Sequence, residues 1–320
     1  MMSFTYLIKR LILTVMTMLL AVGLSGTAFA GVGVLEEDEQ SLSASLTFSG
    51  SNKQWDGNRN VLTSICKRRN VDLSIGYEYG WSYFHTVYSS VNLAYRKCGV
   101  GINRTAIPGA PAGFRINTQY ASGRAWGLGD VELGIRTRFG GHYLDNAAWE
   151  TFLIIPTGYD NNSPSALGRG ALGLGFGLKF SSDPSDRYPY KWGYSAKKWG
   201  WKAGTKLTYF FSSKGNSVAT FAAVQYAFTA SDFEQSGDFL EFRIDNSIGF
   251  QNGGIQQQVF INQAPSAMTN SDQTSFKIKY SHSFIGTGWS GSISIGHAFF
   301  GRNAPKSTSI AAGANYRWRD

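Results

Sequence analysis

Apolar and polar residues alternate over several long segments of this chain, and this pattern limits its fold more than any other feature. In residues 71–79, the apolar residues Val71, Leu73 and Ile75 occupy every second position, with polar residues between them. Four further segments show the same alternation: 131–139, 240–245, 276–281 and 310–318. Because successive side chains of a strand point to opposite faces, each segment predicts a β-strand with one apolar and one polar face.

The length of the segments and the composition of the chain favour a membrane barrel over a water-soluble β-sandwich. Sandwich strands usually have about 5–6 residues, whereas strands of outer-membrane barrels need about 9–11, with apolar side chains toward the lipid. In the segments of this chain, charges of both signs alternate with large aromatic residues. We therefore predict an all-β fold, a single transmembrane antiparallel up-and-down β-barrel. A secreted or periplasmic β domain is the alternative.

Residues 1–30 have the three parts of an export signal. Lys9 and Arg10 supply positive charge, residues 11–24 form an uncharged, mostly apolar run, and Ala28-Phe29-Ala30 offers small residues to signal peptidase. The apolar run is shorter than the about 20 residues that a transmembrane helix needs. We therefore expect a signal peptide that is cleaved after Ala30, and a mature protein in the outer membrane of a Gram-negative bacterium.

Residues 31–320 contain no internal domain boundary and give twelve expected strands, an even number as in single-chain bacterial barrels. A count of 10 or 14 stays open, because residues 181–199 are long for a periplasmic turn and residues 255–261 would fit a further strand. The expected strands are 41–49, 71–80, 83–97, 128–139, 147–157, 170–180, 200–212, 217–229, 237–250, 273–284, 288–300 and 306–318. With both termini in the periplasm, the expected outer loops are 50–70, 98–127, 158–169, 213–216, 251–272 and 301–305.

The polar faces of these strands are expected to line the barrel interior, where they carry charges of both signs. Twelve strands enclose a passage wider than that of an eight-stranded barrel and narrower than that of a porin of 16–18 strands. Opposite charges could also pair across the wall and close it. The predicted lumen-lining residues are Asp72, Glu78, Asp130, Glu132, Arg136, Arg138, Glu241, Arg243, Asp245, Lys277, Lys279 and Arg317.

Aromatic and basic residues gather near the expected strand ends. Outer-membrane barrels carry aromatic girdles at both membrane–water interfaces. The predicted interface aromatics are Trp81, Trp192, Trp199, Trp201, Trp289, Tyr316 and Trp318. The basic stretch Tyr188–Lys206 is interpreted as an interfacial band, and whether it forms a plug, loop or strand stays open. A second basic cluster, Cys66–Arg69, falls on an outer loop, where it could meet lipopolysaccharide phosphates; both clusters could also simply be solvated.

Cys66 and Cys98 are the only two cysteines, and both fall on expected outer loops. Exported proteins meet oxidising conditions, in which disulfides form and persist. We therefore predict a Cys66–Cys98 disulfide, with two buried free thiols as the alternative.

No motif in the sequence predicts catalysis, a metal or a cofactor. Residues 168–173 match G-x-G-x-x-G, but a dinucleotide site needs a helix after this motif, and Gly175 and Gly177 would weaken one. The four histidines lack metal-ligand spacing, and no G-x-S-x-G motif is present. We expect no enzyme activity and no cofactor. An outer-membrane lipid hydrolase stays a second alternative, because a catalytic triad can be assembled from residues distant in sequence.

Three short motifs carry a family resemblance. They are Gly127-Leu128-Gly129-Asp130-Val131-Glu132-Leu133-Gly134, Pro156-Thr157-Gly158-Tyr159-Asp160 and Leu167-Gly168-Arg169-Gly170. Together they resemble the outer-membrane barrels named for the meta pathway of phenol degradation. The resemblance implies a transporter-like barrel that passes small, including aromatic, compounds, and it brings no catalytic residues. The chain departs from such barrels by ending in Trp318-Arg319-Asp320 rather than on the aromatic residue itself.

We accordingly predict a narrow channel for passive uptake or efflux of small aromatic or hydrophobic solutes. The alternative is a closed structural or surface-contact barrel without transport. The expected partners are outer-membrane lipids including lipopolysaccharide, the periplasmic chaperones and the barrel-assembly machinery, with no nucleic acid. The transported solute and the oligomeric state are not given by the sequence.

One mass measurement tests the predicted processing and the disulfide. We expect intact-mass analysis of the exported protein to give a chain that begins at Gly31 and has no alkylatable thiol until it is reduced. A mass that includes residues 1–30 would contradict the cleavage, and two thiols that react without reduction would contradict the bridge.

Overall fold

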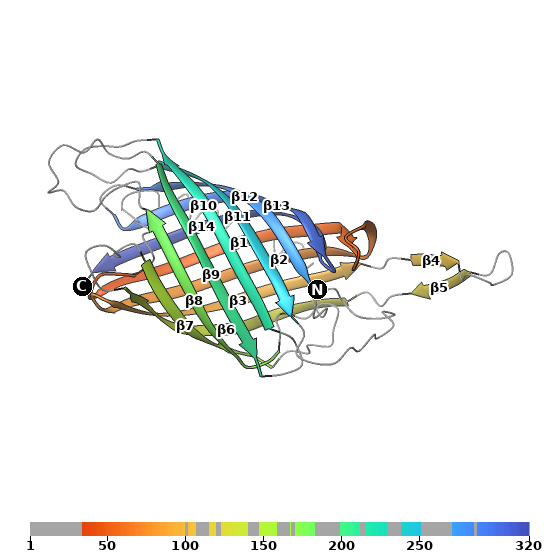
Figure 1. Cartoon of the computed structure of the whole chain (residues 1–320), viewed down its shortest axis with the longest axis horizontal. Coiled ribbons are helices and arrows are strands. Elements are labelled where there is room, and N and C mark those ends of the chain that lie inside the picture. Colours follow the sequence, from red (N-terminus) through yellow and green to blue (C-terminus); the bar gives the residue numbers. More distant parts are fainter. Residues whose placement is uncertain are drawn as a thin grey trace, which may run out of the picture.

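A computed structural model describes residues 34–99, 102–106, 115–119, 123–139, 147–158, 167, 170–182, 199–211, 216–228, 238–250, 271–284 and 287–319. Within these residues the chain forms a closed antiparallel barrel of twelve strands (Figure 1). In chain order the strands are β1 (Glu39–Trp55), β2 (Val61–Ser82), β3 (His85–Gly99), β6 (Gly123–Arg138), β7 (Ala147–Ile155), β8 (Gly173–Ser182), β9 (Trp199–Phe210), β10 (Asn216–Ala227), β11 (Asp238–Phe250), β12 (Asp272–Ser283), β13 (Trp289–Arg302) and β14 (Pro305–Arg319). This arrangement confirms the predicted fold class.

Each barrel strand pairs with its neighbours in the chain, and the pairing of β1 with β14 closes the sheet. Their register begins at Glu39↔Arg319 and runs to Gln54↔Pro305. Closure satisfies the backbone hydrogen bonds of both terminal strands, so the barrel presents no open sheet edge. Two further strands, β4 (Ile102–Ala106) and β5 (Arg115–Gln119), pair only with each other. No helix among the described residues is long and apolar enough to span a membrane.

The first hairpin is longer than the sequence predicts. The expected loop 50–70 is mostly strand, because β1 continues to Trp55 and β2 starts at Val61. The basic cluster Cys66–Arg69 therefore lies in β2 rather than on a loop, which corrects the prediction. Backbone pairing continues here although the apolar alternation has ended, since a hairpin needs only its main-chain hydrogen bonds to extend.

The turn of this hairpin is organised by Asp56. Its Oδ1 accepts hydrogen bonds from the backbone N–H groups of Asn58 and Asn60, at 2.8 Å each. The hydrogen bonds from Asn60 and Asn58 outweigh a small effect of burial and hold the pKa of Asp56 below its usual value. The carboxylate thus fixes the position of the β1–β2 turn.

Other predicted boundaries also change. The expected loop 98–127 contains the β4–β5 pair, and β6 already begins at Gly123. The possible strand 255–261 and most of the stretch 181–199 lie outside the described residues. Cys98 is buried near the end of β3. The side chain of Cys66 lies outside the described part of the chain, so the disulfide stays a prediction.

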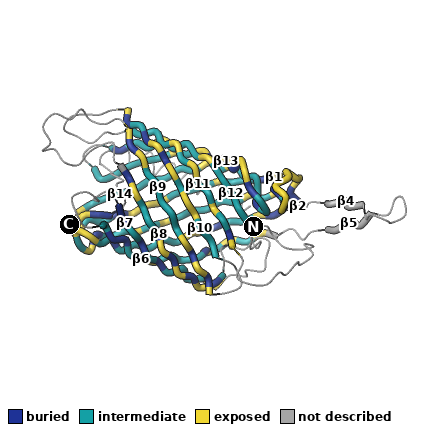
Figure 2. The backbone as a smooth tube through the Cα atoms, viewed as in Figure 1, coloured by how far each residue is buried: buried dark blue, intermediate teal, exposed yellow. Residues whose placement is uncertain are grey.

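Rows of large apolar side chains cross the outer surface of the barrel. One row runs through Ile278, Ile295, Ile310, Phe48 and Val71 on five successive strands. In this row Ile295 is 51%, Ile310 60% and Phe48 38% exposed to the surroundings. Along each strand exposed and less exposed residues alternate (Figure 2). A surface this apolar over most of its circumference is typical of barrels that face lipid.

Aromatic side chains collect at the end of the barrel where the chain begins and ends. The Trp289 and Tyr316 rings stack at 4.7 Å between centroids, and Tyr316 stacks on Trp318 at 5.1 Å. Trp199 packs on Tyr226 at 4.8 Å. Trp81 and Trp201 are exposed at the same end, and Trp192 lies outside the described residues. The exposed aromatic residues near the opposite end include Trp126, Tyr209, Phe211, Phe250 and Phe300.

The outward direction of Leu133 on β6 can be tested by placing a charge there. Leu133 is exposed and pairs with Leu153 of β7 on the apolar surface. We expect Leu133→Arg to lower the free energy of unfolding in lipid vesicles by about 2–4 kcal/mol, because a charge faces hydrocarbon. The control Leu133→Met, which stays apolar, should leave it unchanged. Equal stability of the two variants, measured by urea titration, would contradict the assignment of this face.

Candidate functional site inside the barrel

A hydrogen-bonded ion pair between strands that are not neighbours identifies the inner face of the wall. The Lys206 ammonium of β9 lies 2.7 Å and 2.8 Å from the two carboxylate oxygens of Glu132 on β6. Two strands, β7 and β8, separate them in the sheet. Side chains on the convex outer surface diverge from one another, so this contact can form only across the interior of the closed barrel.

Arg136 is the centre of a buried network next to this pair. Its Nη1 lies 3.4 Å from Glu78 of β2, and its Nε lies 3.3 Å from Glu150 of β7. The same oxygen of Glu150 lies 2.7 Å from Nζ of Lys179 on β8. Arg136 is 6% and Glu150 3% exposed. Buried charges of this kind require partners, and here each has one of opposite sign.

Three aromatic rings lie under the cations of the same wall. Arg136 is 5.0 Å from the ring centre of Tyr88, and Nζ of Lys206 is 3.9 Å from that of Phe152. The hydroxyl of Tyr88 donates a hydrogen bond to Glu132 at 3.3 Å. Two strands further round the wall from Lys206, Arg243 of β11 lies 4.1 Å from the ring centre of Phe221 on β10. Cation–aromatic contact adds to the ion pairing and holds each cation close to the wall.

Glycines leave room for the rings to lie flat against the strands. A Cβ at Gly175 of β8 would approach Cζ of Phe152 to 1.8 Å, and one at Gly134 would approach Cζ of Tyr88 to 2.5 Å. Any larger residue there would displace the ring from the wall. The G-x-G-x-x-G match of the sequence thus ends in a strand, β8, in which Gly175 and Gly177 face Phe152 and Glu150.

A second group of charged residues lies on β11 and β12, with Gln225 of β10 beside it. Arg243 and Asp245 are 2.7 Å apart, and the Gln225 side-chain amide donates to Glu241 at 2.9 Å. Lys279 and Lys277 stand directly across from Glu241 and Arg243 in the β11–β12 register.

The other predicted lumen residues lie apart from both groups. Asp72 pairs with Arg96 of β3 at 2.6 Å, and Asp130 lies where the β3–β6 register shifts. Arg138 and Arg317 lie at the end of the barrel where the chain begins and ends, called the terminal end below. Arg317 pairs with Glu39 at 3.1 Å, and Arg138 donates to the carbonyl oxygen of Val34 at 3.2 Å.

The first described residues lie against the inner wall at the terminal end. Leu35 is fully buried, and its N–H donates to Oγ1 of Thr86 on β3 at 2.7 Å. A Cβ at Gly80 of β2 would come within 1.8 Å of the carbonyl oxygen of Glu36. This segment therefore narrows the terminal end of the barrel next to Arg138.

Several members of the network around Arg136 are not among the lumen-lining residues predicted from the sequence. They are Tyr88, Glu150, Phe152, Lys179 and Lys206. Lys179 shares the strand parity of Gly173, Gly175 and Gly177, which is a signal for the inner face. Within the described residues, no group of three or more His, Cys, Asp or Glu side chains is placed to hold a metal ion.

Comparisons with known proteins show the type of fold and no family. No protein-family model and no curated protein matches the chain. A solved outer-membrane channel from Pseudomonas putida F1 shares 12% of residues over 92% of this chain and 100% of its own, with a TM-score of 0.64. At this identity the likeness shows the fold alone, a closed antiparallel β-barrel. This likeness does not show that the chain belongs to the family named for the meta pathway of phenol degradation.

Two other solved barrels superpose more loosely. The translocator domain of autotransporter NalP from Neisseria meningitidis is 13% identical over 93% of this chain and 92% of its own, with a TM-score of 0.46. The CymD monoaromatic hydrocarbon channel is 9% identical over 92% of this chain and 95% of its own, with a TM-score of 0.40. These two similarities carry no argument here.

Removal of the Arg136 guanidinium tests whether the network stabilises the wall. We expect Arg136→Gln to lower the free energy of unfolding by about 3–5 kcal/mol, because Glu78 and Glu150 lose a buried partner. The matched change Arg243→Gln removes a half-exposed ion pair and should cost about 1 kcal/mol or less. Equal effects of the two changes in urea titrations of vesicle-bound protein would contradict the account.

Proposed function

We propose that the mature chain is an outer-membrane channel, exported after cleavage at Ala30. The outward apolar rows through Ile295, Ile310 and Phe48 would face lipid. The closed sheet has no free edge strand whose backbone would have to hydrogen-bond with water inside the membrane. The solved channel that shares the fold supports this assignment.

In the proposed orientation the chain termini lie in the periplasm. Outer-membrane barrels join their strands by short periplasmic turns and longer outer loops. The turn of residues 83–84 lies at the terminal end, and the segment between β3 and β6 lies at the other. Trp318, one residue before the final strand ends, would serve as the signal for the barrel-assembly machinery.

The observation that carries the channel proposal is the inner wall with its paired charges. Lys206, Glu132, Arg136, Glu78 and Glu150 form a continuous polar surface from β2 to β9. We propose that the remaining charged residues of the alternating strands complete this lining: Asp72, Asp130, Arg138, Glu241, Arg243, Asp245, Lys277, Lys279 and Arg317. A non-enzymatic role follows from this proposal.

The proposed solutes are small aromatic or hydrophobic compounds. Tyr88, Phe152 and Phe221 place ring faces and edges on the inner wall beside the cations. An aromatic solute can stack on such rings while its polar group meets a charge. The resemblance of residues 127–170 to barrels of aromatic degradation supports the same class.

A closed structural barrel is the second candidate, and the Lys206–Glu132 pair favours it. This pair crosses the space in front of β7 and β8 instead of following the wall. If similar contacts fill the remaining cross-section, no solute passes. Conductance therefore separates the two candidates.

We expect the purified mature protein to conduct ions in planar bilayers, and single substitutions of the crossing pair to change its selectivity in opposite directions. Lys206→Gln leaves the Glu132 carboxylate unpaired and should increase the preference for cations, whereas Glu132→Gln should increase the preference for anions. Arg59→Gln, in the β1–β2 turn, is the control and should leave selectivity unchanged. Properly folded wild type and variants that all fail to conduct would overturn the channel in favour of the structural barrel.

The same preparation tests the solute class. Liposome-swelling assays should show faster entry of small phenols and aromatic carboxylates than of sugars of equal size. Equal rates for aromatic and sugar solutes would contradict the proposed preference and leave a general pore.

A further inference from the structure

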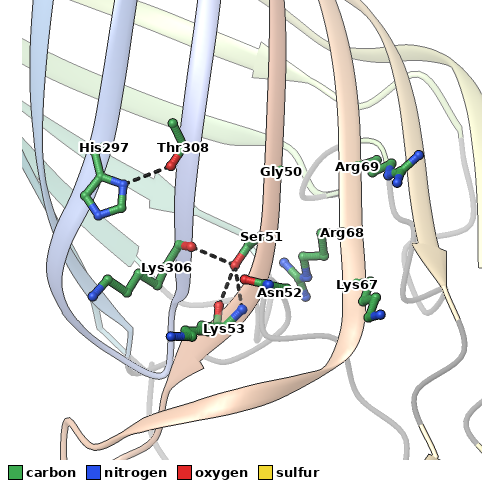
Figure 3. Close-up of a pocket in the computed structure, with 10 residues that line it drawn as sticks. All are labelled: Gly50, Ser51, Asn52, Lys53, Lys67, Arg68, Arg69, His297, Lys306 and Thr308. Atoms are coloured by element: carbon green, nitrogen blue, oxygen red, sulfur yellow. Dashed lines mark hydrogen bonds between the residues drawn. The ribbon is translucent and has the colours of Figure 1, made fainter.

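A basic pocket lies on the outer surface, at the barrel end opposite the chain termini. It has a volume of about 620 Å³ and is lined by residues of β1, β2, β13 and β14. Figure 3 shows these side chains spread over neighbouring strands. The lining residues are Gly50, Ser51, Asn52, Lys53, Lys67, Arg68, Arg69, His297, Lys306 and Thr308.

The strand register places the pocket immediately beside the apolar surface. His297, Thr308, Gly50 and Arg69 pair across the four strands in one row. On each strand the pocket residue is two positions away from a residue of the apolar row. The pairs are His297 and Ile295, Thr308 and Ile310, Gly50 and Phe48, and Arg69 and Val71. Residues two apart on a strand share a face, about 7 Å apart. The basic row therefore faces outward, directly next to the apolar row.

The cations of the pocket have no acidic partner. Lys53, Lys67 and Arg69 are exposed, and their charges form no ion pair with any residue that the structure describes. No Asp or Glu is among the lining residues. By contrast, Arg59 and Arg302 at the same end both pair with Asp272, at 3.1 Å and 3.3 Å. The positive charge of the pocket is thus left uncompensated.

Arg68 also lines the pocket, but its guanidinium does not belong to the outward basic row. It alternates with Lys67 and Arg69 along β2, so its side chain points to the inner face of the wall. The outward cations that could bind an anion are therefore Lys67, Arg69 and Lys306. Phosphate oxygens suit guanidinium groups because they accept two parallel hydrogen bonds.

We infer that this pocket binds the phosphate group of a diphosphorylated glycolipid of the outer leaflet, the lipid A portion of lipopolysaccharide. The phosphate would lie between Lys67, Arg69 and Lys306, and the acyl chains would lie along the apolar row below. The inference rests on the proposed orientation in the outer membrane. A soluble phosphate compound would use the cations but gain nothing from the adjoining apolar surface, which is why we commit to a lipid.

Native mass spectrometry of the mature protein in detergent tests this inference. We expect diphosphorylated lipid A to bind at least about tenfold more tightly than the same lipid after removal of its phosphates, because charge-assisted hydrogen bonds to phosphate are the strong ones. The double variant Lys67→Gln/Arg69→Gln should lose about tenfold in affinity. The control Arg59→Gln removes an exposed arginine at the same end of the barrel that already has a carboxylate partner, and should bind as the wild type does.

Three outcomes would overturn the inference. The first is equal binding of the phosphorylated and dephosphorylated lipids. The second is an equal loss of affinity in Arg59→Gln and in Lys67→Gln/Arg69→Gln. The third is full competition by millimolar inorganic phosphate, which would assign the pocket to soluble phosphate instead. The folded state of each variant is checked by its unboiled mobility on gels.

The failure of this inference can be told from that of the channel. The pocket is on the outer face, so Lys67→Gln/Arg69→Gln should conduct as the wild type does. A barrel that conducts without binding the lipid would reject only the lipid site. A barrel that binds the lipid through these residues without conducting would reject only the channel.

Discussion

The pairing of β1 with β14 is the interaction on which the remaining structure depends. It converts a twelve-stranded sheet into a closed wall, so that each barrel strand has a hydrogen-bonded neighbour on both sides. Once the wall is closed, the two faces of each strand acquire different surroundings. The apolar side chains go outward, and the polar ones share the interior, where charges such as Arg136 and Glu150 are buried against the wall.

This shared interior explains the arrangement of charges and glycines. A carboxylate such as Glu150, almost without exposure, is stable only beside cations, and Arg136 and Lys179 both contact it. The long side chain of Lys206 spans two strands to reach Glu132 because the wall curves toward it. Gly175 removes the Cβ that would otherwise push Phe152 into the passage. At the outer end, by contrast, Lys67 and Arg69 form no ion pair with any residue that the structure describes, and lipid phosphates would be their partners in the proposed site.

The alternation of apolar and polar residues predicts the fold well. Each residue of a barrel strand faces either the lipid or the interior, so every residue contributes to the pattern. The twelve strands and the alternation around Leu133 and Ile310 follow from it. The long first hairpin does not, since pairing beyond Gly50 depends on backbone hydrogen bonds rather than on apolar alternation. The site is predicted only in part. Arg136 and Glu132 stand on the polar parity, but the β6–β7 register that sets Glu150 directly across from Arg136 cannot be read from the sequence. Nor can the curvature of the wall, which brings Lys206 to Glu132 across two strands. In residues 147–155 both the odd and the even positions are mostly apolar. The sequence therefore does not show which face of this strand, and hence Glu150, points inward.

The central claim is that neighbouring residues of one strand face lipid and an aqueous interior in turn. Single cysteines introduced at Phe276, Lys277, Ile278 and Lys279 of β12, in a background without Cys66 and Cys98, test it directly in vesicles. The account predicts that a membrane-impermeant charged thiol reagent labels positions 277 and 279, and that a lipid-soluble maleimide labels 276 and 278. Labelling of all four positions by the charged reagent, or of none, would contradict a lipid-facing barrel with a water-filled interior.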